Sequence, residues 1–395
     1  MPHQLDHPDG SSDGASTVQG QLRRSPLDDR HRGLGAVMTA FAGWEMPLHY
    51  GSVVAEHQAV RTAAGVFDLS HLGTVRVVGA AAADVLARAF TNDVHALDAG
   101  RAQYSLCLDD GGGILDDLLV YHLPGREPAG SYLVVPNAAN TEAVLDALRQ
   151  AADGRTARVL DVKSSLACLA VQGRDSAEAL LQAGVDAADL PYLGCRELDE
   201  ASPGPAAAGG VDAGVSLLAR SGYTGERGYE LFVPVEQAPH LWDRLMAAGV
   251  VPVGLGARDT LRLEMGYPLH GADIALSASP VEARLQWACR GSGFRGEEAL
   301  RRHAADDAAR TRLMGLRATG RGIPRAGQAV HRAGREQPVG ETTSGTYSPT
   351  LRCGIALAYL DPAVAEGDAL EVDVRGRRVA VQATRPPFVE ADPRD

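Results

Sequence analysis

The stretch that decides the fold is residues 111–121, which read Gly-Gly-Gly-Ile-Leu-Asp-Asp-Leu-Leu-Val-Tyr. Glycines favour a tight turn, and an apolar strand follows directly. Because successive strand residues point to opposite faces, Asp116 and Asp117 cannot share one environment. One faces solvent or a turn amide, whereas the other faces inward, where a carboxylate needs a partner or a task. A pair of turn-capping aspartates is the structural alternative.

A second glycine-rich stretch, residues 220–230, reads Arg-Ser-Gly-Tyr-Thr-Gly-Glu-Arg-Gly-Tyr-Glu and ends in Glu230 at the head of an apolar strand. Its glycines permit close approach of the backbone to a ligand. The alternative interpretation is a hairpin turn that carries polar side chains.

A third stretch, residues 254–264, reads Gly-Leu-Gly-Ala-Arg-Asp-Thr-Leu-Arg-Leu-Glu, a glycine turn that opens a helix. Helix N-termini favour anions, and arginine binds carboxylates in bidentate fashion. Arg258 lies so early in the helix that it opposes the helix dipole unless it holds something. An ion pair between Arg258 and an acid of the fold is the alternative.

Around these stretches, periodicity predicts a mixture of strands and helices. Strands are expected at residues 74–78 and 132–135, and a helix that includes Val144, Leu145 and Leu148 is expected after residue 140, capped by Asn140 or Thr141. A second helix starts at Asp175, forms a capping box with Glu178 and ends at Gly184, and a third, with Leu241, Trp242 and Leu245, ends at Gly249.

The last 90 or so residues have a different character. Alternating apolar residues at 370–374 and 379–381 flank a turn at Gly376 and predict a β-hairpin. Residues 327–330 and 354–359 also resemble strands, so a separate β-barrel or sandwich is expected beyond a boundary near residues 291–296. The overall class is α+β, because strands and helices do not alternate regularly. Residues 1–24 are expected to form a disordered leader, and residues 201–214 a surface loop.

Composition excludes several classes of function. The 395 residues carry a net charge of −12, which argues against broad nucleic-acid binding. No stretch is apolar for long enough to span a membrane and no signal peptide is evident, so a cytoplasmic location is expected. The five cysteines form no C-x-x-C pair, and Lys163 is the only lysine, so a metal knuckle, a P-loop and a Schiff base are disfavoured. His71 has no second histidine at metal-ligand spacing and is interpreted as a packed residue.

A collinear series of motifs between residues 25 and 389 resembles the T-protein (aminomethyltransferase) family of the glycine cleavage system. The motifs are Ser25-Pro26-Leu27, residues 41–48, 65–71, 91–93 and 102–105, the Asp116-Asp117 stretch, Asn137-Ala138-Ala139-Asn140, and residues 221–225, 255–259, 340–350 and 354–358.

The resemblance implies a three-domain ring around a central folate site. Residues 25–290 would form the folate-binding region, made of two interleaved α+β subdomains (25–75 with 165–290, and 76–164), and residues 291–389 the C-terminal β-barrel. The implied reaction transfers the methylene of the aminomethyl-lipoyl arm of H-protein to tetrahydrofolate. Ammonia is released and 5,10-methylenetetrahydrofolate is formed, and neither a metal nor a redox cofactor is needed.

The resemblance also implies roles for individual residues. Asp117, the second aspartate of the pair, matches the catalytic carboxylate and would hold folate N10 through a hydrogen bond. Glu230 would accept hydrogen bonds from the pterin. The other implied contacts with folate are Tyr104, Tyr121 and Tyr223 along the folate slot, Asn137 as a polar contact, and Arg258 near the folate tail or the catalytic centre.

Departures from the family pattern concern the one-carbon donor and the docking of H-protein more than the folate site. They are Leu72, Thr74, Pro136, Ala272 and the stretch 287–291. Two alternatives stay open at this point. One is a folate-dependent transferase or demethylase that acts on another donor, and the other is a non-catalytic folate-binding protein, which the intact aspartate pair disfavours.

Overall fold

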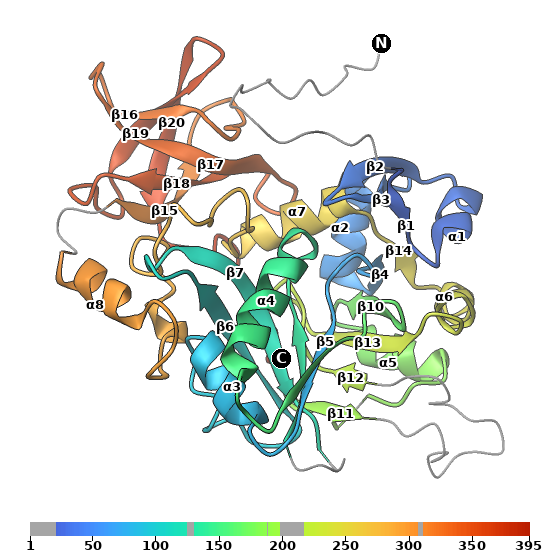
Figure 1. Ribbon diagram of the computed structural model, residues 1–395. Helices are drawn as coiled ribbons and strands as arrows, with labels where there is room; N and C mark the ends of the chain where they lie inside the picture. Colours follow the sequence, from blue (N-terminus) through green and yellow to red (C-terminus); the bar gives the residue numbers. More distant parts are fainter. Residues whose placement is uncertain (1–20, 125–129, 188, 198–216, 307–310) are drawn as a thin grey trace.

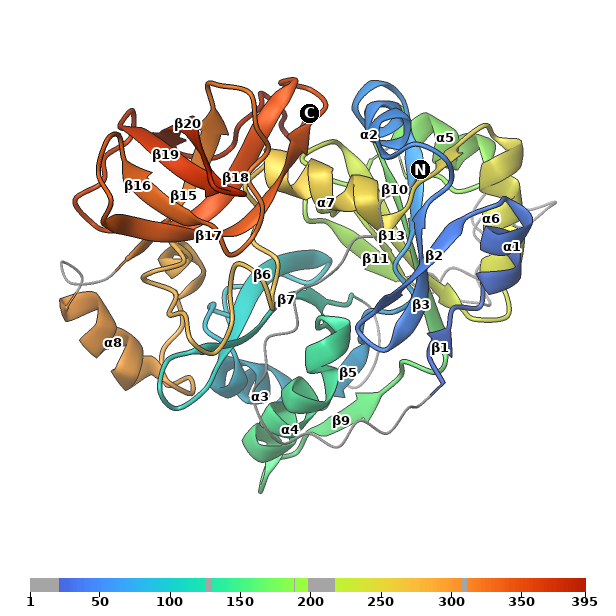
Figure 2. The same cartoon turned by 90° about the horizontal axis from the view of Figure 1, so that it is seen from above.

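The computed structural model describes residues 21–124, 130–187, 189–197, 217–306 and 311–395. Two large sheets and a closed barrel form its three main parts, which surround a common centre (Figures 1 and 2). The α+β class is confirmed by this arrangement. Within the described residues, no helix has the length and apolar character needed to cross a membrane. The predicted loop at 201–214 lies outside the described residues.

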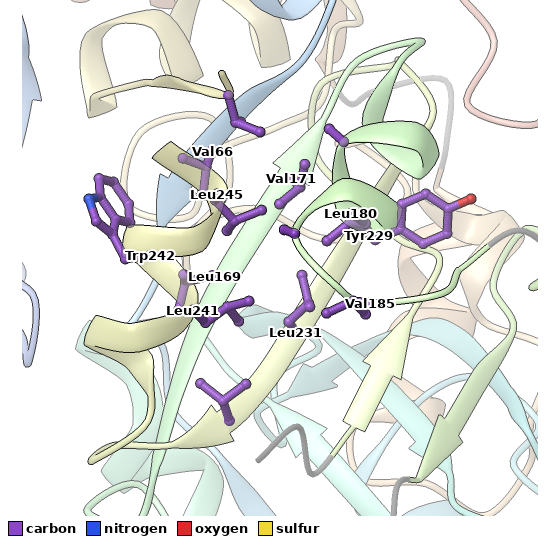
Figure 3. Packing of buried hydrophobic residues seen from close by; sticks show 14 of the residues in the cluster. Val66, Leu169, Val171, Leu180, Val185, Tyr229, Leu231, Leu241, Trp242 and Leu245 are labelled. Carbon is purple, nitrogen blue, oxygen red and sulfur yellow. The ribbon is translucent and has the colours of Figure 1, made fainter. Parts of the chain in front are cut away.

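A six-stranded sheet in the order β11-β12-β13-β10-β4-β14 forms the first part. Its strands are β4 (Gly65–Asp68), β10 (Leu166–Gln172), β11 (Cys195–Glu197), β12 (Leu217–Ala219), β13 (Gly228–Pro234) and β14 (Val251–Pro252). Strand β10 is apolar at nearly every position because both of its faces are covered. Leu169 and Val171 pack with α5 (Ser176–Gln182) and α6 (Ala238–Ala247), as Figure 3 shows. Cys168 and Ala170 face the second sheet.

The second part is a five-stranded sheet in the order β6-β7-β8-β5-β9. Its strands are β5 (Val75–Val78), β6 (Arg101–Leu108), β7 (Ile114–His122), β8 (Ser131–Val135) and β9 (Arg158–Asp161). Helices α3 (Ala82–Ala89) and α4 (Thr141–Ala152) cover one face. Strand β8 ends at Val135, as expected where the next residue, Pro136, has no N–H to donate to a ladder. The predicted strands at 74–78 and 132–135 are confirmed.

The N-terminal segment forms a small sheet in the order β1-β3-β2. It contains β1 (Arg23–Arg24), β2 (Val37–Phe41) and β3 (Trp44–His49), with α1 (Asp28–Gly33) and α2 (Val53–Thr62) beside it. Order was expected to begin near Ser25, and β1 already includes the two residues before it. Arg23 and Arg24 pair with Trp44 and Glu45, and the Arg23 guanidinium lies 5.7 Å from the Trp44 ring centroid.

A buried carboxylate anchors this segment to the six-stranded sheet. Asp68, at the end of β4, is bonded to His31 Nε2 at 2.9 Å and accepts hydrogen bonds from the Ser25 hydroxyl and the Ser70 N–H. Tyr50 contacts the other ring nitrogen of His31 at 2.8 Å. Burial raises the pKa of Asp68, but hydrogen bonding to and the charge of His31 outweigh it, and the pKa falls to about 2.

The third part is a closed barrel in the order β15-β18-β17-β16-β19-β20. Its strands are β15 (Arg312–Ala318), β16 (Ala329–Arg332), β17 (Pro338–Ser348), β18 (Cys353–Leu360), β19 (Ala369–Val374) and β20 (Arg377–Thr384), and α8 (Glu297–Ala305) precedes them. The predicted hairpin is β19–β20, which turns at Arg375 and Gly376, both with positive φ. The strand expected at 327–330 begins two residues later. The proposed domain boundaries stay predictions.

The predicted helices exist, but their caps differ. Gly184 and Gly249 adopt positive φ directly after α5 and α6, which confirms both ends. The capping box of Asp175 is not formed, because this residue occupies the N-cap position without a side-chain capping bond. Asn140 likewise occupies the N-cap position of α4 without capping it.

Helix α7 (Leu255–Glu264) joins the barrel to the remainder of the molecule. Glu264 accepts hydrogen bonds from Arg61 of α2 and from Ser348 and Thr350 of the barrel. Arg262 donates to Asp273 at 2.6 Å and to Ser344 at 2.8 Å. A register shift in β17 lies between Thr342 and Ser344, and the intervening Thr343 donates to Asp273 at 2.5 Å.

Candidate active site

Asp116 and Asp117 are adjacent on β7, just before the stretch of this strand that pairs with β8, and they lie next to the segment that follows the C-terminal end of β8. Asp116 has no exposed surface, and its carboxylate accepts three hydrogen bonds. The Asn137 N–H reaches Oδ2 at 3.0 Å, and Oδ1 accepts from Asn137 Nδ2 at 2.9 Å and Asn140 Nδ2 at 2.7 Å. Burial and the charge of Asp117 raise the pKa of Asp116 to about 7. The two aspartates therefore have different environments, as predicted, and Asp116 is the one that is completely buried.

Asp117 is partly exposed and is held on two sides. The Tyr104 hydroxyl donates to Oδ2 at 3.0 Å, and Asn137 Nδ2 donates to Oδ1 at 3.0 Å. Burial raises the pKa of Asp117, although the hydrogen bond from the Tyr104 hydroxyl opposes the rise. The Tyr104 ring stacks on Trp287 with centroids 5.3 Å apart. Asp117 is thus a base of raised pKa with a fixed orientation.

A second carboxylate, Glu230 of β13, contacts the side of β7 from which Asp117 and Tyr121 project. Its Oε2 accepts from the Tyr121 hydroxyl at 2.9 Å and from the Ser221 hydroxyl at 2.5 Å. No donor of the described residues contacts its other oxygen, which leaves an acceptor for a ligand. The Tyr121 ring has no exposed surface, so Tyr121 orients Glu230 instead of lining a slot, and the expectation for this residue changes accordingly.

Arg258 has no ion-pair partner within the described residues. Its guanidinium lies 4.7 Å from the Tyr223 ring centroid, and burial lowers its pKa. The Tyr223 hydroxyl donates to the Pro268 carbonyl, so this ring presents its face to Arg258. The acid pairs expected as an alternative for Arg258 belong instead to Arg262, which binds Asp259 and Asp273.

The strand spaces these groups along one face. Asp117 and Tyr121 are four residues apart on β7, and alternation puts both on the same side. A strand rises roughly 3.3 Å per residue, so Asp117 and Tyr121, which holds Glu230, are about 13 Å apart along β7. Two anchored carboxylates at this separation suit an elongated ligand that carries N–H donors at one end and a reacting amine near the other.

The glycines of the two glycine-rich stretches serve internal packing. A Cβ at Gly222 or Gly228 would lie 2.0 or 2.3 Å from the amide of Gln172, around which this loop wraps. The anion at the N-terminus of α7 is the Glu56 carboxylate, which accepts from Gly254 N at 2.9 Å. These contacts correct the expectation that the glycines of residues 220–230 admit a ligand.

His71 is buried, which confirms its interpretation as a packed residue. Its ring meets Phe41 edge-on at 5.4 Å. Burial and the charge of Arg258 lower its pKa to about 3, so the ring is neutral at pH 7.

Sequence reasoning missed four residues that touch the site. They are Ser221, which binds Glu230; Asn140, which binds Asp116; His270, which binds Asn140; and Trp287, which stacks on Tyr104. The Asn137-Ala138-Ala139-Asn140 motif held a signal for Asn140. His270 lies 130 residues away from Asn140, and no local pattern marks it.

Comparison with known proteins matches both the two-sheet region and the C-terminal barrel to models of a single class of protein. Residues 27–292 match the GCVT N-terminal domain, and residues 311–390 match the glycine cleavage T-protein C-terminal barrel domain. The chain therefore belongs to the glycine cleavage T-protein family.

Relatives agree over nearly the whole chain. An aminomethyltransferase of Frankia alni is 49% identical, over 94% of this chain and 99% of the relative. One of Mycobacterium tuberculosis is 46% identical, over 93% and 97%. The crystal structure of the glycine cleavage system aminomethyltransferase T from Bartonella henselae covers 94% of this chain and 99% of its own, with a TM-score of 0.86 and 32% identity. The enzyme class of this chain is that of an aminomethyltransferase.

Proposed function

We propose that this chain catalyses the aminomethyltransferase step of glycine cleavage with tetrahydrofolate as acceptor and lipoylated H-protein as donor. The observation that carries the proposal is the pair of anchored carboxylates, Asp117 on β7 and Glu230 on β13, which is held by Tyr121 of β7. Family membership supplies the reaction class, and the site chemistry fits a ligand with pterin-type N–H donors and an anionic tail.

Glu230 and Arg258 divide the binding of folate between them. The free oxygen of Glu230 accepts from the donor edge of the pterin, while Tyr121 and Ser221 hold the carboxylate in place. Arg258, which lacks an ion-pair partner within the described residues, binds the folate near its tail or near the catalytic centre. Its position over Tyr223 keeps the planar cation oriented.

Tetrahydrofolate supplies the amine that accepts the carbon. Asp117 accepts the proton of that amine in a hydrogen bond, so that the nitrogen lone pair is directed at the incoming carbon. Tyr104 and Asn137 fix the two carboxylate oxygens while this bond forms. The carbon breaks its bonds to the lipoyl sulfur and to its own amino nitrogen, and forms bonds to N5 and N10 of tetrahydrofolate. The two folate N–H protons leave with the departing groups, one in ammonia and one in the dihydrolipoyl thiol.

The decisive experiment compares Asp117→Asn with the wild type. Ammonia release and methylenetetrahydrofolate formation from aminomethyl-loaded H-protein are measured with and without tetrahydrofolate. We expect kcat to fall by about 100-fold or more in Asp117→Asn, while the dissociation constant of tetrahydrofolate changes by less than about threefold. Asp110→Asn is the matched control, because Asp110 is exposed and, among the described residues, forms an ion pair with Arg295 alone.

The outcomes separate the parts of the proposal. Wild-type turnover that requires folate and is lost in Asp117→Asn supports it. Folate binding without turnover would move the assignment to a different one-carbon donor. Absence of folate binding by the wild type would overturn the proposal.

A further inference from the structure

A chain of polar side chains lies directly behind Asp117. His270 Nε2 is 3.1 Å from the carbonyl oxygen of Ile114, and His270 Nδ1 is 2.9 Å from Asn140 Nδ2. Asn140 Nδ2 also donates to Asp116 Oδ1 at 2.7 Å. Asn137 Nδ2 then lies within 3.0 Å of both Asp116 Oδ1 and Asp117 Oδ1. The chain thus runs from the loop after α7 to the candidate catalytic carboxylate.

Chemistry fixes the direction of these hydrogen bonds. A carbonyl oxygen can only accept, so His270 Nε2 carries a proton and donates to Ile114. Nδ1 must then accept from Asn140, because an amide NH₂ can only donate. Both hydrogens of Asn140 are used, one toward His270 and one toward Asp116. Protonation of His270 at Nδ1 would place two donors against each other and break the chain.

Asp116 cannot itself meet a substrate, because it has no exposed surface. A buried carboxylate is costly unless donors surround it, and here the donors are amides of Asn137 and Asn140. In return, Asp116 fixes the side-chain amide of Asn137, the same group that holds Asp117. The orientation of Asp117 therefore depends on residues that do not touch the ligand.

The hydrogen-bonded side chains from His270 to Asn140 are not needed to cap α4 or to hold the loop that carries His270. Asn140 makes no capping bond to α4. The loop that carries His270 is already held by Asp273, which accepts from Leu269 N at 2.9 Å and from Arg262. Tyr359 of the barrel donates to the Asp273 carbonyl at 2.8 Å. These independent ties leave the positioning of Asp117 as the task of His270.

We propose that Asp116, Asn140 and His270 are positioning residues, which hold the carboxylate of Asp117 through Asn137 in the orientation that the transfer step needs. This inference rests on the proposed function, because it assigns a task to the surroundings of Asp117. When His270 is lost, Asn140 and Asn137 lose their fixed orientation, and Asp117 loses donors that favour its charged form.

The test compares three single variants in the full chain. His270→Phe keeps a ring but removes both hydrogen bonds. His270→Gln restores an acceptor and a donor in the same one–three relation as the imidazole nitrogens. His122→Phe is the matched control, because His122 lies at the far end of β7 and its Nδ1 bonds only the Leu97 carbonyl oxygen, at 2.8 Å.

In His270→Phe we expect kcat to fall about tenfold or more, and the tetrahydrofolate dissociation constant to stay within about twofold. The acid limb of the kcat profile should move to higher pH, because Asp117 becomes easier to protonate. His270→Gln should recover most of kcat, and His122→Phe should match the wild type. Equal kcat and equal pH profiles in His270→Phe and the wild type would overturn the proposal.

A second measurement is independent of the transfer reaction. The carboxyl carbon of Asp117, assigned by its loss in Asp117→Asn, is titrated by ¹³C NMR without substrate. We expect its acid dissociation constant to fall about tenfold in His270→Phe and to stay unchanged in His122→Phe. If the wild type proves inactive with H-protein, the proposed function fails while this titration still decides the inference. An unchanged titration of Asp117 in His270→Phe would refute the positioning role.

Discussion

Buried carboxylates occur in two settings in this protein, and they behave oppositely. Glu264, between α7 and the barrel, is surrounded by Arg61, His57, Ser348 and Thr350. Burial raises its pKa, yet these partners outweigh burial and bring the pKa to about 2. Asp116 and Asp117 are surrounded by amides and a phenol, and here burial is the larger influence, so both pKa values are raised.

The difference lies in the charge of the partners. A cation stabilises a carboxylate against the cost of leaving water, whereas neutral donors orient it and compensate only part of that cost. The framework therefore holds acids that stay charged, whereas burial raises the pKa of both aspartates of the site, that of Asp116 to about 7. Three experiments would break or sharpen this contrast.

The largest effect is expected from Glu264→Ala. Removing the acid leaves the buried Arg61 and His57 without their shared partner, and loss of one member of a buried ionic network costs about 3–5 kcal/mol. Urea unfolding at pH 7 measures the change in the free energy of unfolding. A loss below about 1 kcal/mol would show that the network does not hold the barrel to α7.

The next effect concerns acid stability through Asp68. Its folded pKa of about 2 lies below the unfolded value of 3.8, so its contribution is present above the unfolded pKa and disappears as pH falls toward 2. The contribution is about 2 kcal/mol at pH 7. Compared with the wild type, Asp68→Asn should flatten the loss of stability between pH 5 and pH 2, measured by urea unfolding at each pH. Parallel curves for the two proteins would contradict a charged Asp68.

The third effect is of similar size to that of Asp68, has the opposite sign and comes from Asp116. Its folded pKa of about 7 lies above the unfolded value, so its contribution is present at low pH and is lost as pH rises toward 7. We expect the wild type to lose about 2 kcal/mol between pH 5 and pH 7 through this group. Asp116→Asn should remove that slope even though it weakens the bonds to Asn137. If the free energy of unfolding depends on pH equally in the wild type and in Asp116→Asn, Asp116 does not take up a proton in this range and behaves like Glu264.

Local sequence patterns predicted the parts of the fold that depend on neighbours along the chain. Periodicity located β5, β8 and the β19–β20 hairpin, because side-chain alternation is a local property. Gly184 and Gly249 marked helix ends, since each must adopt positive φ. Capping predictions failed at Asn140, where a distant acceptor, Asp116, takes the side chain that would otherwise bond to the helix.

The site was predictable where residue type and spacing sufficed, and otherwise not. The Asp116-Asp117 pair predicted one inward-facing carboxylate, but the alternation of side chains along a strand does not show which of the two faces inward. The glycines around Tyr223 were attributed to a ligand, whereas Gln172 occupies the space that they leave. His270 could not be predicted because its contacts, Ile114 and Asn140, become neighbours only through folding.

Helix α7 has a consequence for the exchange of the barrel between relatives. It places Arg258 beside the Tyr223 ring. Arg262 and Glu264 contact the barrel hydroxyls of Thr343, Ser344, Ser348 and Thr350, directly or through Asp273. A barrel borrowed from a relative would seat on this helix only if it brought matching hydroxyls. Exchange of the barrel alone, without hydroxyls at these four positions, is therefore expected to leave Arg262, Asp273 and Glu264 without hydrogen-bond donors and acceptors at this contact.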